Sequence, residues 1–192
     1  MGKIVVSEFV SLDGVMEDPG GAEGFKYGGW TFAFSSPEQE QFKAEELVKA
    51  DALLLGRRTY QGFAAAWPNM EEATGEYGEK MNSMPKYVVS TTIADSDMTW
   101  NATRITTNFA EELPRLKQQI DQDILIFGSN QLVHALIAQN LIDEYRLMVF
   151  PVMLGVGKRI YPEGGEKKTL RLVESKPFAS GVTVLTYEPV KE

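Results

Sequence analysis

Cysteine is absent from the sequence, and histidine occurs once, at His134. Without thiols the chain has no disulfide framework and no thiolate chemistry, which agrees with a reducing cytoplasm, the location we expect. A single histidine cannot supply several converging nitrogen and sulfur ligands, so we expect no metal site. No G-x-S-x-G segment is present to hold a serine nucleophile beside that histidine. These absences argue against the zinc, thiol and serine-triad classes of enzyme.

The sequence also lacks a long hydrophobic run and an excess of positive charge. The first segment, MGKIVVSEFV, meets Glu8 after a few apolar residues, and it is too short and too polar for a signal peptide or a membrane span. The 19 Lys and Arg residues against 27 Asp and Glu residues give a net charge of −8. Such a surface repels nucleic acid and anionic membranes, so we expect neither as a partner.

The length of 192 residues and the hydrophobic content of 43% predict a single domain, residues 1–192, with a sizeable core. Short apolar segments typical of strands lie at 3–10, 52–55, 86–91, 100–106 and 124–127. Between them we expect helices at 36–49, 59–66, 69–83 and 110–119, and one more capped by Ser129. The final strand-like segments follow one another without a helix and should pair antiparallel, at 142–155, 170–178 and 181–189. The predicted fold class is α/β with a mixed, mostly parallel sheet.

A glycine-rich segment, SLDGVMEDPGGAEGFKYGGW, occupies residues 11–30 and contains six glycines. A long irregular segment of this kind inside a compact domain is usually a functional loop or lid. A plain surface excursion is the alternative, and the sequence leaves both interpretations open.

Three of the expected strands end in small, hydroxyl-bearing or basic residues, in the segments Gly56-Arg57-Arg58-Thr59, Ser90-Thr91 and Gly128-Ser129-Asn130. In open α/β sheets ligands bind outside the carboxyl ends of the strands. Glycine allows close backbone approach, a helix N-terminus offers free N–H groups, and arginine adds charge-assisted bonds. Together these features favour a ligand with several phosphates, such as a dinucleotide.

Each of these segments, taken alone, has an ordinary structural explanation. The arginine segment can be a solvated turn, Ser90-Thr91 can end a strand, and Gly128-Ser129 can cap a helix. The sequence also contains no G-x-G-x-x-G after its first strand and no G-x-x-x-x-G-K-[ST]. The hypothesis therefore depends on the three strand ends occurring together, and it supports neither a Rossmann nor a P-loop assignment.

The order of the motifs carries a family resemblance over nearly the whole chain. They are SLDG (11–14), LLLGRRTY (53–60), KYVVST (86–91), LIFGSNQLV (125–133), LIDEYRLMVFPVMLGVGKRIY (141–161) and VESKPFASGVTVLTYEP (173–189). The chain resembles the dihydrofolate reductase superfamily, in the branch similar to the C-terminal reductase domain of the riboflavin-biosynthesis protein RibD. The resemblance implies a dihydrofolate-reductase-like three-layer α/β/α fold and NADPH as the cofactor.

The resemblance also implies which residues bind the cofactor. Arg57, Arg58 and Thr59, after Gly56, would hold the 2′-phosphate and the pyrophosphate, and Ser90 and Thr91 would lie by the adenosine half. The turn that wraps the pyrophosphate corresponds to Gly128, Ser129, Asn130, Gln131 and Leu132. These residues agree with the strand ends singled out above on physical grounds.

The implied reaction is hydride transfer from NADPH to a C=N or C=O bond of a small pterin- or pyrimidine-like heterocycle. For the proton donor, Glu38 and Asp13 are the candidates, and Glu40 competes with Glu38. The glutamates can instead be first-turn acids that face the helix dipole, and Asp13 can be part of an Asp-Gly turn. Two aromatic residues are candidates for an apolar substrate wall, with core packing as the alternative, namely Trp30 and Phe34.

Several alternatives stay open beside this reductase. One is the riboflavin-pathway reduction of 5-amino-6-(5-phosphoribosylamino)uracil, although Ile126 stands where those reductases tend to carry an acid. Another is a nucleotide-binding module without catalysis. We also expect a homodimer, because the apolar residues of 147–152 would exceed what one core can cover and because the branch it resembles often forms dimers.

Overall fold

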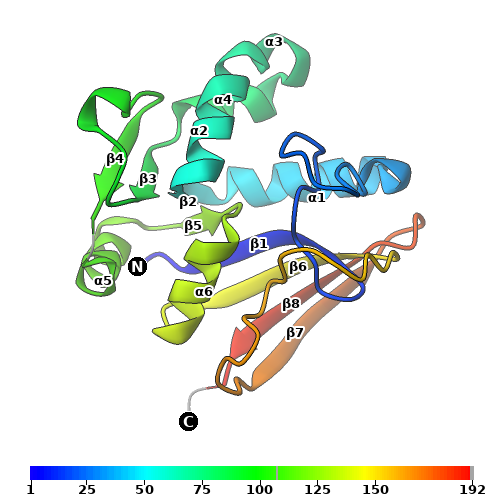
Figure 1. The fold of residues 1–192 in the computed structure, drawn as a ribbon. Coiled ribbons are helices and arrows are strands. Elements are labelled where there is room, and N and C mark those ends of the chain that lie inside the picture. Colours follow the sequence, from blue (N-terminus) through cyan, green and yellow to red (C-terminus); the bar gives the residue numbers. More distant parts are fainter. Residues whose placement is uncertain (107, 191–192) are drawn as a thin grey trace.

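The computed structural model describes residues 1–106 and 108–190, and its strands form one mixed sheet of eight (Figure 1). The strand order is β4-β3-β2-β5-β1-β6-β8-β7. The predicted domain, 1–192, includes residues 107, 191 and 192, which lie outside the described residues. The strands are β1 (Ile4–Ser11), β2 (Ala50–Gly56), β3 (Lys86–Val89), β4 (Ala102–Ile105), β5 (Asp123–Ile126), β6 (Glu144–Phe150), β7 (Leu170–Pro177) and β8 (Thr183–Pro189).

The pairing of the strands changes along the chain as the sequence pattern predicts. Strands β1 to β6 pair with one another in parallel, whereas β8 pairs antiparallel with both β6 and β7. The parallel strands are nearly continuous apolar runs, and all of Leu53, Leu54 and Leu55 in β2 are fully buried. Such runs occur where helices cover both faces of a sheet.

The helices supply those two outer layers. Helices α1, α2 and α4 cover one face of the sheet, and α5 and α6 cover the other (Figure 1). The α-helices are α1 (Pro37–Val48), α2 (Arg57–Ala66), α3 (Glu71–Thr74), α4 (Glu76–Ser83), α5 (Phe109–Gln119) and α6 (Asn130–Ala138). Short 3₁₀ helices lie at Phe32–Phe34, Trp67–Asn69 and Asp95–Asp97. Within the described residues, no helix has the length and apolar character that crossing a membrane requires.

Two of the predicted helices differ from the structure. Helix α2 begins at Arg57 rather than Thr59, so both arginines belong to its first turn. The polar segment 69–83 is not one helix, because Gly75 has φ 55° and separates α3 from α4. Helix α4 contributes to the core, since Met81 is fully buried against the sheet.

The late strand β6 is covered by the chain itself. Its residues Leu147, Met148 and Phe150 are at most 6% exposed and pack against other residues of the same chain. Surplus apolar surface on this strand is therefore no reason for a dimer, and the homodimer stays a prediction.

A buried ionic network joins α1 to the sheet. Arg146 in β6 contacts Glu144 at 2.6 Å, Asp123 at 2.7 Å and Glu46 at 3.4 Å, and its side chain is only 16% exposed. Glu46 in α1 is almost fully buried and also binds Lys43. Without Arg146, Glu46 and Glu144 would keep only Lys43 and Lys3 within the described residues, and Asp123 would lose its bond to the guanidinium. Leaving buried charge poorly paired costs more than losing the attraction alone.

We predict that Arg146→Met destabilises the protein by about 3–5 kcal/mol, because it leaves three carboxylates without their shared cation. The measurement is urea unfolding at pH 7, followed by circular dichroism. Arg171→Met is the matched control, because Arg171 binds Glu188 at 2.6 Å on the sheet but is 64% exposed. Exposed pairs contribute little, so equal losses in the two variants would contradict the prediction.

Candidate active site

A cavity of about 1050 Å³ opens along the carboxyl ends of β1, β2, β3 and β5. All of the residues that the sequence singled out for cofactor binding line it, although they come from three separate segments. They are Gly56, Arg57, Arg58, Thr59, Ser90, Thr91, Gly128, Ser129, Asn130, Gln131 and Leu132. Parallel strands cause this convergence, because their carboxyl ends lie at one edge of the sheet.

Two glycines allow the strand ends to approach this closely. A Cβ on Gly56 would lie 2.1 Å from Ser129 Oγ, so a side chain there would push the two turns apart. Gly128 has φ +79°, which disfavours other residues, and a Cβ there would lie 3.0 Å from Thr59 Oγ1. The result is a narrow backbone cradle between the starts of α2 and α6.

The starts of α2 and α6 present free N–H groups at this cradle. Gly56 and Ser129 are the N-cap residues of the two helices, and neither makes a side-chain capping bond. The expectation that Ser129 caps its helix is thus correct in position, but its hydroxyl does not make the bond. Free N–H groups and the helix dipole together favour an anion.

Arg57 and Arg58 add two positive charges at the start of α2. Both side chains are exposed and line the cavity, and within 1–106 and 108–190 neither forms an ion pair. Cations in the first turn of a helix are unfavourable, because the dipole is already positive there. Their position therefore favours an external anion at the mouth of the cavity.

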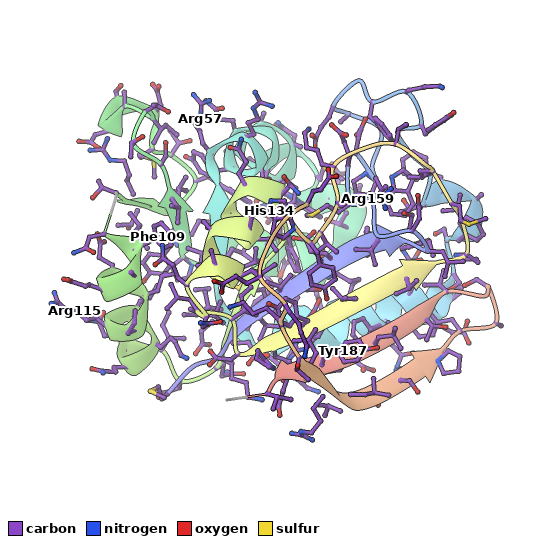
Figure 2. All side chains as sticks on the ribbon, turned by 60° about the horizontal axis from the view of Figure 1, so that its bottom comes forward. Arg57, Phe109, Arg115, His134, Arg159 and Tyr187 are labelled. Carbon is purple, nitrogen blue, oxygen red and sulfur yellow. The ribbon has the colours of Figure 1, made fainter. Side chains whose placement is uncertain are left out.

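Some of the other polar residues at this edge already have partners inside the protein. Ser90 Oγ accepts the N–H groups of Thr92 and Ile93 at 3.2 and 3.1 Å, so it closes its own turn. Asn130 Nδ2 donates to the carbonyl oxygen of Arg159 and lies 3.0 Å from His134 Nε2. His134 on α6 lies next to the segment that carries Arg159, and its Nε2 is 2.9 Å from the Arg159 carbonyl oxygen (Figure 2). Thr91 is exposed and lines the cavity.

The glycine-rich segment after β1 forms part of the cavity wall. Residues 16–20, 22 and 23 line it, which favours the functional-loop interpretation over a plain surface excursion. The buried carboxylate of Asp18 holds the loop by accepting the N–H groups of Glu23 and Phe25, each at 3.0 Å. Lys158, another cavity residue, binds Glu17.

The two carboxylates considered as proton donors, Asp13 and Glu38, lie away from the cavity. Asp13 accepts hydrogen bonds from the N–H groups of Leu154 and Gly155 at 3.0 and 2.8 Å, and from Ser11 Oγ. Burial alone would raise the pKa of Asp13, but these hydrogen bonds outweigh it and lower that pKa to about 2. Asp13 therefore stays ionised at neutral pH. Glu38 Oε2 accepts the N–H of Ala179 at 3.2 Å.

The two aromatic residues considered for the substrate wall also lie outside the cavity lining. Trp30 and Phe34 pack edge-on against Phe150, with ring centroids 5.3 and 6.0 Å away. Trp30 Nε1 donates to the carbonyl oxygen of Glu17 at 2.9 Å. Their contacts are those of the core cluster at the β6–β8 end of the sheet, the alternative that the sequence left open.

Glu8 lines the cavity and was not among the predicted site residues. It lies on β1, and its Oε1 accepts the N–H of Gly128 from the turn after β5. The signal was available in the sequence, because Glu8 is an acid in the middle of the apolar strand IVVSEFV. An ionisable group at such a position needs a partner or a function.

The surroundings of Glu8 disfavour its ionised form. Burial raises the pKa of the Glu8 carboxyl to about 8, and the N–H of Gly128 and the charge of Lys43 only partly offset this. Lys43 itself is held by Glu46 and by Ser7 Oγ, at 2.5 and 2.8 Å, with its Nζ 4.1 Å from the centre of the Phe127 ring. The site thus contains a carboxyl group that is largely protonated at neutral pH.

Side chains from α2, the 3₁₀ helix Trp67–Asn69 and α4 make part of the wall apolar, namely Phe63, Trp67, Tyr77 and Met81. The residues present therefore fit a dinucleotide: a backbone cradle with two uncapped helix starts, two exposed arginines, an apolar wall and a buried acid. Among the residues that the structure describes, no group of three or more His, Asp or Glu side chains gathers as metal ligands would.

Residues 2–184 match the family model of the RibD C-terminal domain. An uncharacterized protein of Bacillus subtilis (strain 168), YyaP, is 29% identical over 187 residues, which cover 96% of this chain and 94% of that protein. The alignment thus runs nearly from end to end in both proteins.

Solved structures of similar fold include a provisionally named riboflavin biosynthesis protein from Shewanella sp. PV-4. Its TM-score is 0.76 at 19% identity, covering 98% of this chain and 99% of that one. Dihydrofolate reductase from Enterococcus faecalis, complexed with NADP(H), has a TM-score of 0.64 at 14% identity, covering 98% and 97%. These similarities confirm the predicted dihydrofolate-reductase-like α/β fold.

The family model covers almost the whole chain, and the fold agrees with it independently of the sequence motifs. The chain belongs to the RibD C-terminal domain family.

Proposed function

We propose that this protein is an NADPH-dependent reductase that acts on a C=N or C=O bond of a small pterin- or pyrimidine-like heterocycle. The observation that carries the proposal is the pair of exposed arginines in the first turn of α2, at the mouth of the cavity. The bound NADP(H) of the Enterococcus faecalis dihydrofolate reductase, a protein of similar fold, supports the same class of cofactor.

The arginines account for a preference for NADPH over NADH. The 2′-phosphate is the group that distinguishes the two cofactors, and guanidinium groups bind phosphate with charge-assisted, forked hydrogen bonds. Arg57 and Arg58 would hold this phosphate, and Thr59, the next residue of α2, would add a hydroxyl group. Ser90 and Thr91, at the end of the neighbouring strand β3, would lie by the adenosine.

The backbone cradle would hold the pyrophosphate. Gly128 and Ser129 precede α6, and Asn130, Gln131 and Leu132 form its first turn, where free N–H groups favour an anion. Gly56 contributes by leaving room for this turn. When bound, NADPH supplies a hydride from its dihydronicotinamide ring. The residues of the chain orient the cofactor, exclude water and provide a proton.

The substrate would lie at the β1 end of the cavity, beside Glu8 and the glycine-rich loop. The loop residues Met16 and Glu17, with Phe9 and Phe127, give this end a partly apolar lining that includes two aromatic rings. A planar heterocycle fits these surroundings. The riboflavin-pathway substrate is the second candidate, because the chain belongs to the family named for that pathway's reductase domain.

A substrate screen tests the proposal directly. NADPH oxidation, followed by its absorbance, would be measured with dihydropterins, with aminopyrimidines and with 5-amino-6-(5-phosphoribosylamino)uracil. Turnover of the last compound alone would favour the riboflavin-pathway activity. Binding of NADPH without turnover of any of them would favour a nucleotide-binding module without catalysis.

We predict that Arg57→Ala and Arg58→Ala each weaken NADPH binding by about 1.5–3 kcal/mol, or about 10- to 150-fold in Kd. NADH binding should change much less, because NADH lacks the 2′-phosphate. Calorimetric titration of both cofactors gives the two values. The control is Arg115→Ala, since Arg115 lies on α5, apart from Arg57 at the start of α2 (Figure 2). An unchanged NADPH affinity in both variants would place the 2′-phosphate elsewhere.

We also predict that Gly128→Ala weakens the binding of NADPH and NADH alike, because the cradle contacts the pyrophosphate common to both. The cause is the φ of +79° at Gly128, together with the 3.0 Å distance between the added Cβ and Thr59 Oγ1. A residue with a Cβ in this left-handed conformation is strained by about 1–2 kcal/mol. Gly62→Ala in α2 is the control, since its Cβ would meet nothing within 4 Å. Calorimetry reports the affinities, and thermal unfolding shows whether Gly128→Ala is still folded. A folded Gly128→Ala protein with wild-type affinity would exclude the cradle as the pyrophosphate site.

A further inference from the structure

We propose that Glu8 is the catalytic acid of this site and that its carboxyl group gives up its proton in response to positive charge on the cofactor ring beside it. This inference rests on the proposed NADPH-dependent reduction and assigns a role in it to a residue of β1. It identifies NADP⁺, rather than NADPH, as the ligand whose binding makes the Glu8 carboxyl group lose its proton.

The order of the strands places Glu8 at the ring end of a bound dinucleotide. Along the sheet edge the order is β3, β2, β5, β1. The arginines that would hold the 2′-phosphate follow β2, and the cradle for the pyrophosphate follows β5. The second nucleoside must then continue in the same direction, which brings its ring to the end of β1.

The contact between Glu8 and the cradle fixes the position of the acid. Register pairs Val6 of β1 with Ile126 of β5, so Glu8 lies two residues further toward the carboxyl ends, level with Gly128. The N–H of Gly128 donates to Glu8 Oε1. Glu8 Oε2 has no hydrogen bond within 1–106 and 108–190, and the residue lines the cavity. One carboxyl oxygen is therefore anchored, and the other is available to carry a proton.

The charged groups around Glu8 act in opposite directions on the protonation of its carboxyl group. From α1, Lys43 favours the ionised form and Glu46 opposes it, and these two are already bound to each other. On β6 the register partner is the apolar Leu147, and α6 begins with the uncharged Asn130. The other charged side chains of the cavity wall either have partners or are exposed, namely Glu17, Asp18, Glu23, Arg57, Arg58 and Lys158.

The reaction balances with one hydride and one proton. The carbon of the substrate C=N or C=O bond gains the hydride, its π bond breaks, and the heteroatom takes the proton from the Glu8 carboxyl. The substrate is reduced by two electrons, NADPH is oxidised to NADP⁺, and Glu8 is left as a carboxylate. That carboxylate faces the positive ring until NADP⁺ leaves, after which solvent protonates it again. Burial, which raises the pKa of Glu8 to about 8, keeps its carboxyl group protonated at neutral pH.

Calorimetric titration of wild-type protein with NADP⁺ and with NADPH tests this without any substrate. In buffers of different ionisation enthalpy at pH 7, NADP⁺ binding should release about one proton more than NADPH binding. The ratio of NADP⁺ to NADPH affinity should rise by up to about tenfold per pH unit between pH 6 and 7.5. The 2′-phosphate is common to both ligands, so its own titration cancels in this ratio.

Two substitutions test whether the proton released on NADP⁺ binding comes from Glu8. Glu8→Gln keeps an oxygen for the N–H of Gly128 and should abolish the difference in proton release while NADPH still binds. Glu23→Gln is the matched control, since Glu23 is an exposed carboxylate on the same cavity wall, and it should behave as wild type. If both ligands bind and release equal numbers of protons, Glu8 does not respond to the ring and the inference is wrong. If neither ligand binds, the proposed function itself is wrong.

Unfolding gives an independent readout that needs no ligand. A carboxyl whose pKa is raised from 4.5 in the unfolded chain to about 8 stabilises the fold below pH 4.5 and loses this contribution as the pH rises to 8. The urea midpoint of wild type should therefore fall relative to that of Glu8→Gln between pH 5 and 8. Parallel pH profiles of the two proteins would mean that Glu8 is ionised throughout and cannot serve as the acid.

Discussion

The close approach of β2 and β5 at their carboxyl ends is the constraint on which the site depends. Gly56 lies against Ser129, and a single added carbon would meet the serine oxygen at 2.1 Å. Because the two turns touch, the starts of α2 and α6 face one cavity instead of two separate surfaces. The N–H groups at the starts of two helices, and the arginines of one, are thereby placed around the same cavity.

The two faces of the sheet handle buried charge differently. On the α1 face, Arg146, Glu46 and Asp123 neutralise one another in a network that fixes the helix to the strands. At the cavity, Glu8 has no comparable cation, and its only direct partner within the described residues is the N–H of Gly128. A paired carboxylate is an inert structural element, whereas an unpaired one can change its protonation. The fold thus separates the charges that stabilise it from the charge that can react.

The sequence anticipated the residues that line the cavity at the ends of β2, β3 and β5 better than it identified the acid on β1, and the reason is physical. Glycine, arginine and hydroxyl residues at strand ends act through local backbone geometry, which a sequence pattern describes directly. The roles of Asp13 and Glu38 depend on which backbone N–H groups reach them from residues about 140 positions away. The long-range contact that defines Glu8 is of the same kind, so only its odd place in an apolar strand could have signalled it. The sheet order, likewise, is a tertiary property, although the change from parallel to antiparallel pairing was predictable.

In the proposed reaction, the strand order would also keep phosphate binding and proton transfer from interfering with each other. Arg57 and Arg58 are exposed and would attract a phosphate at the β2 end of the cavity. Glu8 lies two strands away, beyond β5, where burial rather than an arginine sets its protonation. An arginine beside Glu8 would bind phosphate there and would also hold the acid ionised, leaving no proton to give. Placing the cations and the acid on different strands of one parallel sheet lets each keep the charge state that its role requires.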